Sequence, residues 1–184
     1  SESNVFMYTK ALAKLDKTDS IYKQVVILTL LSLLATSLIF GITYILDPST
    51  VANANGSESF DAAPWVVGIF IGPPIETFLF QTLLLLAVKR LTEMSGQTDN
   101  WFPAFLATSI VFATAHGITE SSFYLGFTNT INRIPLSISL ALLAISHRTK
   151  ENGMPFVAVT FTHACYNLMI FVVVVGLNFV QLNL

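Results

Sequence analysis

A run of 23 residues without a single charge, 24–46, is the feature that most constrains the fold of this chain. A transmembrane α-helix needs about 20 consecutive apolar residues to cross the hydrocarbon core of a bilayer. Only 11% of the 184 residues are charged and 53% are hydrophobic, whereas soluble domains carry about 25% charged residues. We therefore expect an integral membrane protein.

Four further apolar segments follow the first, over 65–88, 101–118, 121–146 and 153–180. Their lengths predict an all-α, polytopic transmembrane helical bundle with about five to six spans. The first half of the 121–146 segment is expected to be irregular or to line a cavity, because it contains polar residues and a proline. These residues are Asn129, Asn132, Arg133 and Pro135.

The 65–88 segment contains a proline pair, Pro73 and Pro74. Two prolines remove two backbone donors, so we expect the helix to kink or to restart at this point. If the helix restarts, Pro74 lies in its first turn and Glu76 lies close to its N-terminal end. Free backbone donors and the helix dipole would then favour the ionised carboxylate.

The first 20 residues are more polar than the rest of the chain. Val5, Tyr8, Leu12 and Leu15 recur at helical spacing, with lysines off that stripe. This pattern favours a short amphipathic helix at the lipid surface or, equally, a segment that packs on the domain. We expect the amphipathic segment over 1–20 and a single transmembrane helical domain over 21–184. The one cysteine, Cys165, excludes an internal disulfide.

Basic residues predict the orientation. Eight of the nine Lys and Arg residues fall on one side of a five-span arrangement, and the positive-inside rule makes that side cytoplasmic. The N-terminus is then inside and the C-terminus outside. We expect a multi-pass protein of the bacterial inner membrane, surrounded by lipid. The net charge of −2 indicates no nucleic-acid partner.

Four polar residues stand out in the apolar segments: Glu76, His116, His163 and Asn167. A carboxylate inside a membrane is rare, faces a protein interior or a wet cavity, and marks a functional site. An isolated His or Asn can instead be a hydrogen-bonding contact between helices. Together the four are suited to activating a water molecule and stabilising an oxyanion, provided that they share one pocket.

Two of the segments carry complete motifs that resemble signatures of the CPBP family. This family comprises the CAAX-protease and bacteriocin-processing membrane proteins and includes the type II CAAX prenyl endopeptidases. Its second motif, FxxxH, reads Phe112 to His116, and its third motif, HxxxN, reads His163 to Asn167. The resemblance covers about 64–175, and the order and spacing of the motifs make it more specific than any single motif.

The first family motif, EExxxR, is incomplete in this chain. Glu76 matches the first Glu, and Phe80 matches the Phe that commonly precedes the Arg. Thr77 and Gln81 replace the second Glu and the Arg. These two positions are one helical turn apart, so the charged residues could pair in the family. Because both charges are absent here, we expect a neutral replacement with a hydrogen bond between Thr77 and Gln81.

The resemblance implies an intramembrane endopeptidase that hydrolyses a peptide bond in a peptide or a membrane-anchored protein. Glu76 would act as the general base on water with the help of His116, while His163 and Asn167 would stabilise the oxyanion. Thr77, Phe80, Gln81 and Phe112 would support them. We expect no cofactor, because the zinc motif HExxH is absent; in a zinc-dependent enzyme the ligands would be Glu76, His116 and His163.

A non-proteolytic member of the same family is the alternative. Such a protein would be an immunity factor, a scaffold or an accessory subunit that binds a partner in a membrane complex. The absence of the second Glu and the Arg at Thr77 and Gln81 favours this alternative. A small transporter is less well supported, because the chain has no paired half-helices in two matching halves.

Overall fold

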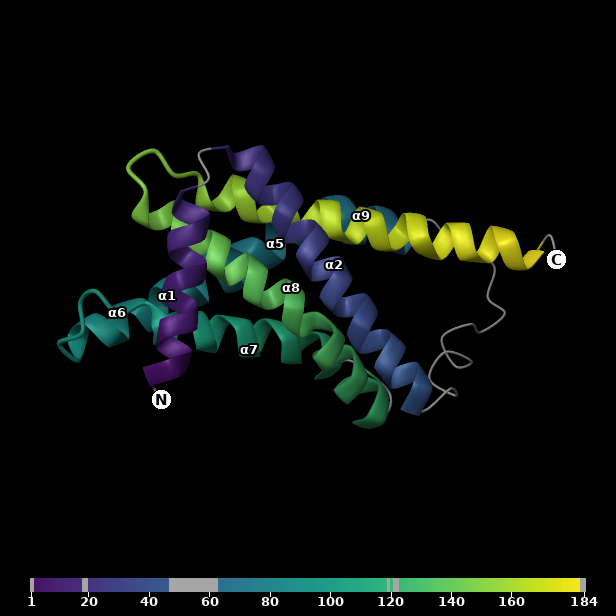
Figure 1. Cartoon of the computed structure of the whole chain (residues 1–184), viewed down its shortest axis with the longest axis horizontal. Coiled ribbons are helices and arrows are strands. Elements are labelled where there is room, and N and C mark those ends of the chain that lie inside the picture. Colours follow the sequence, from purple (N-terminus) through teal and green to yellow (C-terminus); the bar gives the residue numbers. More distant parts are fainter. Residues whose placement is uncertain (1, 18–19, 47–62, 119, 121–122, 183–184) are drawn as a thin grey trace.

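The computed structural model of the chain describes residues 2–17, 20–46, 63–118, 120 and 123–182 (Figure 1). All regular structure in these residues is helical, so the expected all-α class is confirmed. Most of the polar loop between the first two spans lies outside the described residues. The helices are α1 (Glu2–Asp16), α2 (Ile21–Leu46), α4 (Ala63–Val66), η1 (Val67–Ile71), α5 (Gly72–Glu76), η2 (Thr77–Leu84), α6 (Leu85–Met94), α7 (Phe102–Ile118), α8 (Phe123–Thr149) and α9 (Pro155–Leu182).

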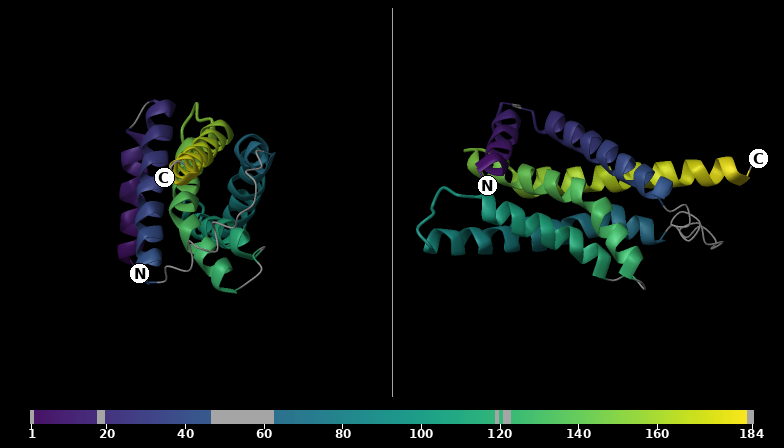
Figure 2. Two further views of the ribbon diagram at one scale, coloured as in Figure 1. Left: turned by 90° about the vertical axis from the view of Figure 1, so that its right-hand side faces the viewer. Right: turned by 60° about the horizontal axis from the view of Figure 1, so that its bottom comes forward.

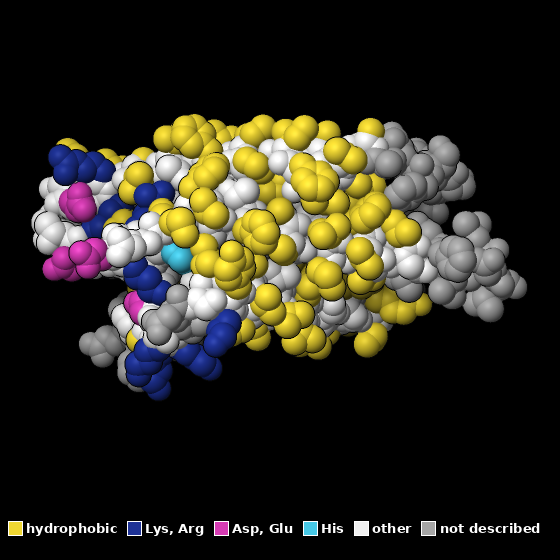
Figure 3. All heavy atoms as spheres, turned by 90° about the horizontal axis from the view of Figure 1, so that it is seen from above, with side chains coloured by type: hydrophobic (Ala, Val, Ile, Leu, Met, Phe, Trp, Pro, Cys, Tyr) yellow, Lys and Arg dark blue, Asp and Glu magenta, His cyan; other side chains and the backbone are white. Residues whose placement is uncertain are grey.

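Three helical runs are long and apolar enough to cross a membrane: Ile21–Leu46, Ala63–Met94 and Pro155–Gly176. Their outer faces carry large exposed apolar side chains, among them Leu34 and Phe70, which are each 68% exposed. On the face drawn in Figure 3, such side chains cover the middle of the molecule and charged ones gather at one end. This distribution identifies a membrane protein, because lipid can cover an apolar surface that water cannot.

Helix α8 is the centre of the bundle. From Leu136 to His147, nearly every residue is buried, as expected for a helix that is surrounded on all sides. Helices α2, α7 and α9 pack around it, and α1 contacts it near its C-terminal end (Figures 1 and 2). The hydrophobic core therefore follows α8.

The run from Ala63 to Met94 combines α-helical turns with the wider turns of the π-helices η1 and η2. Its buried face repeats every four residues, at Ile69, Pro73, Thr77, Gln81, Leu85 and Lys89. An α-helix with about 3.6 residues per turn would rotate such a stripe away from the core. The wider π-helical turns keep the stripe aligned. Thr77 and Gln81 therefore face the bundle interior.

The proline pair widens the helix and does not break it. The backbone N–H of Gly72 donates to the carbonyl of Val67, five residues earlier. The next bond of this type would run from Pro73 to the carbonyl of Gly68, but proline has no N–H. Asn167 of α9 supplies the missing donor, with its Nδ2 atom 2.7 Å from the Gly68 carbonyl oxygen. The expected restart was wrong, because the helical run continues from Ala63 to Met94, and Glu76 does not lie at a free helix N-terminus.

Helix α8 is likewise continuous through Pro135. Neighbouring hydroxyl groups bind the carbonyls around this proline: Thr36 Oγ1 donates to Asn132 at 3.2 Å, and Ser32 Oγ donates to Pro135 at 3.4 Å. Such bonds let a membrane helix keep an internal proline. The expectation of an irregular first half was wrong, whereas the expectation that it lines a cavity is confirmed below.

Helix α1 packs on the bundle. The Tyr8 side chain is 9% exposed, and its ring lies 5.6 Å from Phe102 and 5.0 Å from Phe105 between centroids. At the other end of α1, the hydroxyl of Ser146 donates to Asp16 at 2.6 Å. Of the two alternatives left open by the sequence, the structure therefore supports the packed segment.

Helices α7 and α8 cross closely at two glycines, Gly117 and Gly126. A methyl group added to Gly117 would overlap the Thr130 hydroxyl and the Gly126 carbonyl. We expect Gly117→Ala to lower the free energy of unfolding by about 1–3 kcal/mol, the usual cost of overpacking. Thermal unfolding in detergent would measure this loss.

The matched control is Gly41→Ala, because an added methyl group there meets no atom within 4 Å. Alanine favours helix over glycine by about 1 kcal/mol, so this variant should be at least as stable as the natural protein. Equal stability of the Gly117 and Gly41 variants would contradict a close helix crossing at Gly117.

Candidate active site

Three helical segments bring Glu76, His116 and His163 together. The Glu76 Oε2 atom lies 3.4 Å from Nε2 of His116 and 3.7 Å from Nε2 of His163. These residues lie at the end of α5, in the last turn of α7 and in the third turn of α9. The structure therefore has the shared position that the chemistry requires, while the roles of the residues stay predictions.

Phe112 holds the two imidazole rings in place. Its side chain is fully buried, and its ring centroid lies 4.8 Å from that of His116 and 5.5 Å from that of His163. Phe80 meets the same ring edge-on at 5.5 Å. This packing gives a physical reason for the phenylalanine in FxxxH and for Phe80 in the first motif, since both restrict how the histidines can turn.

The hydrogen bond that His116 makes determines its tautomer, and therefore whether the nitrogen next to Glu76 donates or accepts. Its Nδ1 atom lies 2.9 Å from the carbonyl oxygen of Phe112. A carbonyl only accepts, so Nδ1 carries the proton and Nε2 of the neutral ring presents a lone pair. A proton held between this Nε2 and the Glu76 carboxyl would bind both groups. The pair is thus suited to taking up and releasing one proton.

His163 is almost completely buried, at 1% exposure. Its Nδ1 atom has no hydrogen-bond partner among the described residues. A donor without an acceptor is costly in a buried site, so we assign the proton of the neutral ring to Nε2. That N–H points to the side of Glu76, where it can donate to a carboxylate or to a substrate oxygen.

A cavity of about 420 Å³ opens beside Glu76. Its lining residues are Glu76, Phe80, Ala115, His116, Glu120, Asn129 and Arg133. One liquid water occupies about 30 Å³, so the space admits several waters or a short stretch of polypeptide. The Glu76 side chain is 29% exposed. It is therefore accessible to water in spite of its position within an apolar segment.

Two of the residues that were expected to line a cavity do so, Asn129 and Arg133, whereas Glu120 was not expected in the cavity wall. Among the described residues, Arg133 makes no ion pair with Glu76 or Glu120, since neither carboxylate lies within 4.0 Å of it. Asn129 instead donates to the Glu120 carboxylate. Asn129 and Arg133 are one helical turn apart in the sequence, so both lie on the face of α8 that lines the cavity.

Asn167 has a different partner from the one expected. Its amide donates to the Gly68 carbonyl, which Pro73 leaves without a backbone donor. An Asn side chain has two N–H donors, so one is engaged in holding η1 against α9 and one is left over. The observed contact makes Asn167 a positioning residue for the helix that carries Glu76.

Thr77 and Gln81 are fully buried, yet they do not bind each other. Among the described residues, neither the Thr77 hydroxyl nor the two polar atoms of the Gln81 amide have a hydrogen-bond partner. The expected hydrogen bond between these side chains was therefore wrong. The two positions are adjacent on the buried stripe of the helix, but their side chains do not meet. A buried polar group without a partner costs about 1–3 kcal/mol.

A double-mutant cycle tests whether side chains at positions 77 and 81 can still form an ion pair. We expect Thr77→Glu or Gln81→Arg alone to cost about 3–5 kcal/mol of unfolding free energy, since each buries a charge without a partner. The double variant should recover a large part of that loss through an ion pair between the new side chains. Thermal unfolding of all four proteins in detergent gives the coupling energy.

The reference for this cycle is the ordinary additivity of distant sites, which holds within about 0.5 kcal/mol. If the double variant loses the sum of the two single losses, the positions do not pair. That outcome would contradict the idea that Thr77 and Gln81 replace a supporting ion pair.

Within the described part of the chain, no group of three or more His, Cys, Asp or Glu residues is arranged to hold a metal ion. Zinc requires its ligands around one point, at about 2.0–2.2 Å for nitrogen and oxygen donors. The Glu76 carboxylate lies 3.4 Å and 3.7 Å from the two histidine nitrogens, and Glu76, His116 and His163 would be the ligands if zinc bound here.

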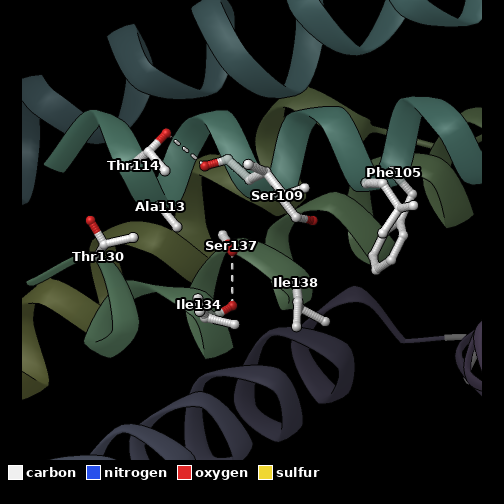
Figure 4. A pocket seen from close by; sticks show the side chains of 10 residues that line it. Phe105, Ser109, Ala113, Thr114, Thr130, Ile134, Ser137 and Ile138 are labelled. Carbon is white, nitrogen blue, oxygen red and sulfur yellow. Dashed lines mark hydrogen bonds between the residues drawn. The ribbon is translucent and has the colours of Figure 1, made fainter. Parts of the chain in front are cut away.

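A second cavity, of about 210 Å³, lies between α7 and α8 (Figure 4). Its wall is mostly apolar. The Ser137 hydroxyl donates to the carbonyl of Ile134 in its own helix, and that of Thr114 to the carbonyl of Ile110. No ionisable residue lines this cavity. It therefore offers no acid–base chemistry.

Comparison with known proteins assigns the chain to a family. The sequence model of the family described as type II CAAX prenyl endopeptidase Rce1-like matches residues 58–169. This stretch contains Glu76, Phe112, His116, His163 and Asn167. Neither a curated protein nor a solved structure matches the chain. Because the match covers more than half of the sequence, the chain belongs to the type II CAAX prenyl endopeptidase Rce1-like family.

Proposed function

We propose that this protein is an intramembrane endopeptidase in which Glu76 activates a water molecule. One observation carries the proposal: the Glu76 Oε2 atom lies between Nε2 of His116 and Nε2 of His163, at 3.4 Å and 3.7 Å, and the same carboxylate opens on a polar cavity. A positioned base with a second proton carrier and an oxyanion donor is the set of groups that peptide hydrolysis by water requires.

The reaction follows from these positions. Water in the cavity gives a proton to Glu76 while its oxygen attacks the carbonyl carbon of the scissile bond. The Nε2–H of His163 donates to the oxyanion that develops, and the second N–H of Asn167 is a further donor one turn along the same face of α9. His116 accepts the proton at Nε2 and passes it to the leaving nitrogen. The C–N bond breaks, one carboxyl group and one amine form, and Glu76 is regenerated.

The substrate is a peptide or a segment of a membrane-anchored protein, since the reactive carboxylate belongs to a helix long enough to span the bilayer. A multi-pass protein of the bacterial inner membrane fits the apolar surface of the bundle. No step in this mechanism uses a cofactor, and every proton transfer involves a side chain of the chain itself.

Cleavage in water enriched in ¹⁸O tests the proposal. The purified protein in detergent is incubated with a peptide mixture, and the products are analysed by mass spectrometry. We expect one heavy oxygen in each new carboxyl group, and we expect a chelator of zinc to leave the rate unchanged. Loss of activity with the chelator and recovery with zinc would overturn the metal-free mechanism. Absence of cleavage in any mixture would overturn the enzymatic function.

A non-proteolytic membrane protein that binds a partner is the second candidate. The observation that favours it is the buried pair Thr77 and Gln81, whose polar side-chain atoms have no partner. An accessory subunit should co-purify with the same membrane partner whether residue 76 is Glu or Gln. Purification of both forms from native membranes decides between the candidates, because an enzyme would lose cleavage in the Gln form.

A further inference from the structure

The basic side chains mark one end of the bundle. Eight Lys and Arg residues lie on α1, at the start of α2, at the end of α6 and around the end of α8: Lys10, Lys14, Lys17, Lys23, Lys89, Arg90, Arg148 and Lys150. Figure 3 shows Lys and Arg side chains gathered at one end of the molecule. We call this the basic end. In membrane proteins, loops rich in Lys and Arg stay in the cytoplasm.

The active-site cavity reaches the opposite end. Among its lining residues, Glu120 follows the end of α7 and Asn129 lies in the second turn of α8. At 1.5 Å per residue, Asn129 is about 28 Å along α8 from Arg148. Figures 1 and 2 place the end of α7 and the start of α8 away from the turn between α6 and α7, which belongs to the basic end. The ninth basic residue, Arg133, lies inside the cavity.

Toward the basic end, packed side chains close the bundle. Gln81, one turn past Glu76 on the same helix, is 1% exposed, and Leu85 is completely buried one turn further on. Leu143 of α8 is also completely buried. The cavity thus borders Glu76 on the side of Glu120 and Asn129, away from these packed side chains.

We propose that the active-site cavity opens on the non-cytoplasmic side of the membrane. The substrate is then a polypeptide segment presented on that side, either an exported peptide or the non-cytoplasmic end of a membrane-anchored protein. The orientation rests on the charges and the cavity alone, whereas the substrate class also rests on the proposed function. The sequence between α2 and α4 agrees, because residues 47–62 contain acidic residues but no Lys or Arg.

Labelling of single cysteines in intact bacterial cells tests the orientation. The half-buried Cys165 is first replaced with Ala, and Glu120→Cys or Thr98→Cys is then introduced. Thr98 is exposed in the turn between α6 and α7 at the basic end. With a membrane-impermeant maleimide, we expect Glu120→Cys to be labelled fully without permeabilisation and Thr98→Cys only after it. The reverse pattern, or equal labelling of both from outside, would overturn the proposal.

A fusion after Leu184 gives a second measurement that does not depend on the cysteine variants. Alkaline phosphatase needs the oxidising periplasm to form its disulfides, so the fusion should be active, and a green fluorescent protein fusion at the same position should be dark. An inactive phosphatase together with a bright fluorescent fusion would overturn the proposed orientation.

Sealed vesicles separate this inference from the proposed function. We expect an added peptide to be cut by right-side-out vesicles and not by inside-out vesicles, while both preparations cut it after detergent treatment. Cleavage by inside-out vesicles alone would overturn the side of access and leave the peptidase function standing. No cleavage in detergent would overturn the function, and labelling would still decide the orientation.

Discussion

Glu76→Gln is expected to abolish peptide cleavage while the protein stays folded and inserted in the membrane. Glutamine keeps the shape of the side chain but cannot accept the proton of the attacking water. General-base catalysis contributes about 10²- to 10⁴-fold, so kcat/KM should fall by at least about a hundredfold. Glutamine can also still donate to Nε2 of His116, which lies 3.4 Å from the carboxylate. Thermal unfolding in detergent should therefore change little.

The matched control is Glu93→Gln at the basic end. The Glu93 carboxylate lies 3.3 Å from Lys89 and 3.4 Å from Arg90, outside the cavity that contains Glu76. The same chemical change there removes two ion pairs of a carboxylate whose side chain is 33% exposed, and it should leave kcat unchanged. A Glu76→Gln protein that cleaves as fast as the natural protein would remove Glu76 from the mechanism.

His163→Ala is expected to lower kcat/KM by about 10²- to 10³-fold, the usual effect of removing an oxyanion donor. The loss should lie mainly in kcat, because the donor acts on charge that develops in the transition state. The variant also leaves a gap beside Phe112, so stability should fall as well. Measuring kcat on the folded fraction at a temperature well below unfolding separates the two effects.

His147→Ala is the matched control for a buried histidine. His147 is 7% exposed and lies past the end of the expected 121–146 span, with Nε2 2.7 Å from the Gln24 amide oxygen. Its loss should lower stability without changing kcat. His163→Gln restores a donor, so it should recover part of the lost kcat. If His163→Ala kept full kcat, or if Gln rescued stability alone, His163 would have only a structural role.

The residues of the candidate site could be read from the sequence to a large extent, because charges in apolar segments are so few. Glu76 is conspicuous in a span of otherwise uncharged residues, and the spacing of His163 and Asn167 put both on one face of a helix. The partner of Asn167 could not be read in this way. Its bond to the Gly68 carbonyl depends on Pro73, which lies on another helix and removes a donor there.

Local propensity also misled the expectations at the prolines. Pro73 and Pro135 each argue for a break in an isolated helix. In the bundle, Asn167 donates a hydrogen bond to the carbonyl that Pro73 leaves free, and Thr36 and Ser32 donate to carbonyls near Pro135. These donors come from helices far away in the sequence, so only the packed structure shows that both helices continue.

The sequence by itself determined the helical membrane class, the three long apolar helices and the isolated position of Glu76 in one of them. Long uncharged runs can satisfy their backbone groups in lipid only as closed hydrogen-bonded structures, and this constraint acts within each segment. The tertiary structure decided that Glu76, His116 and His163 meet, that Thr77 and Gln81 do not bind each other, and where the cavity opens. These facts depend on side chains from different helices, and no local pattern specifies how helices cross.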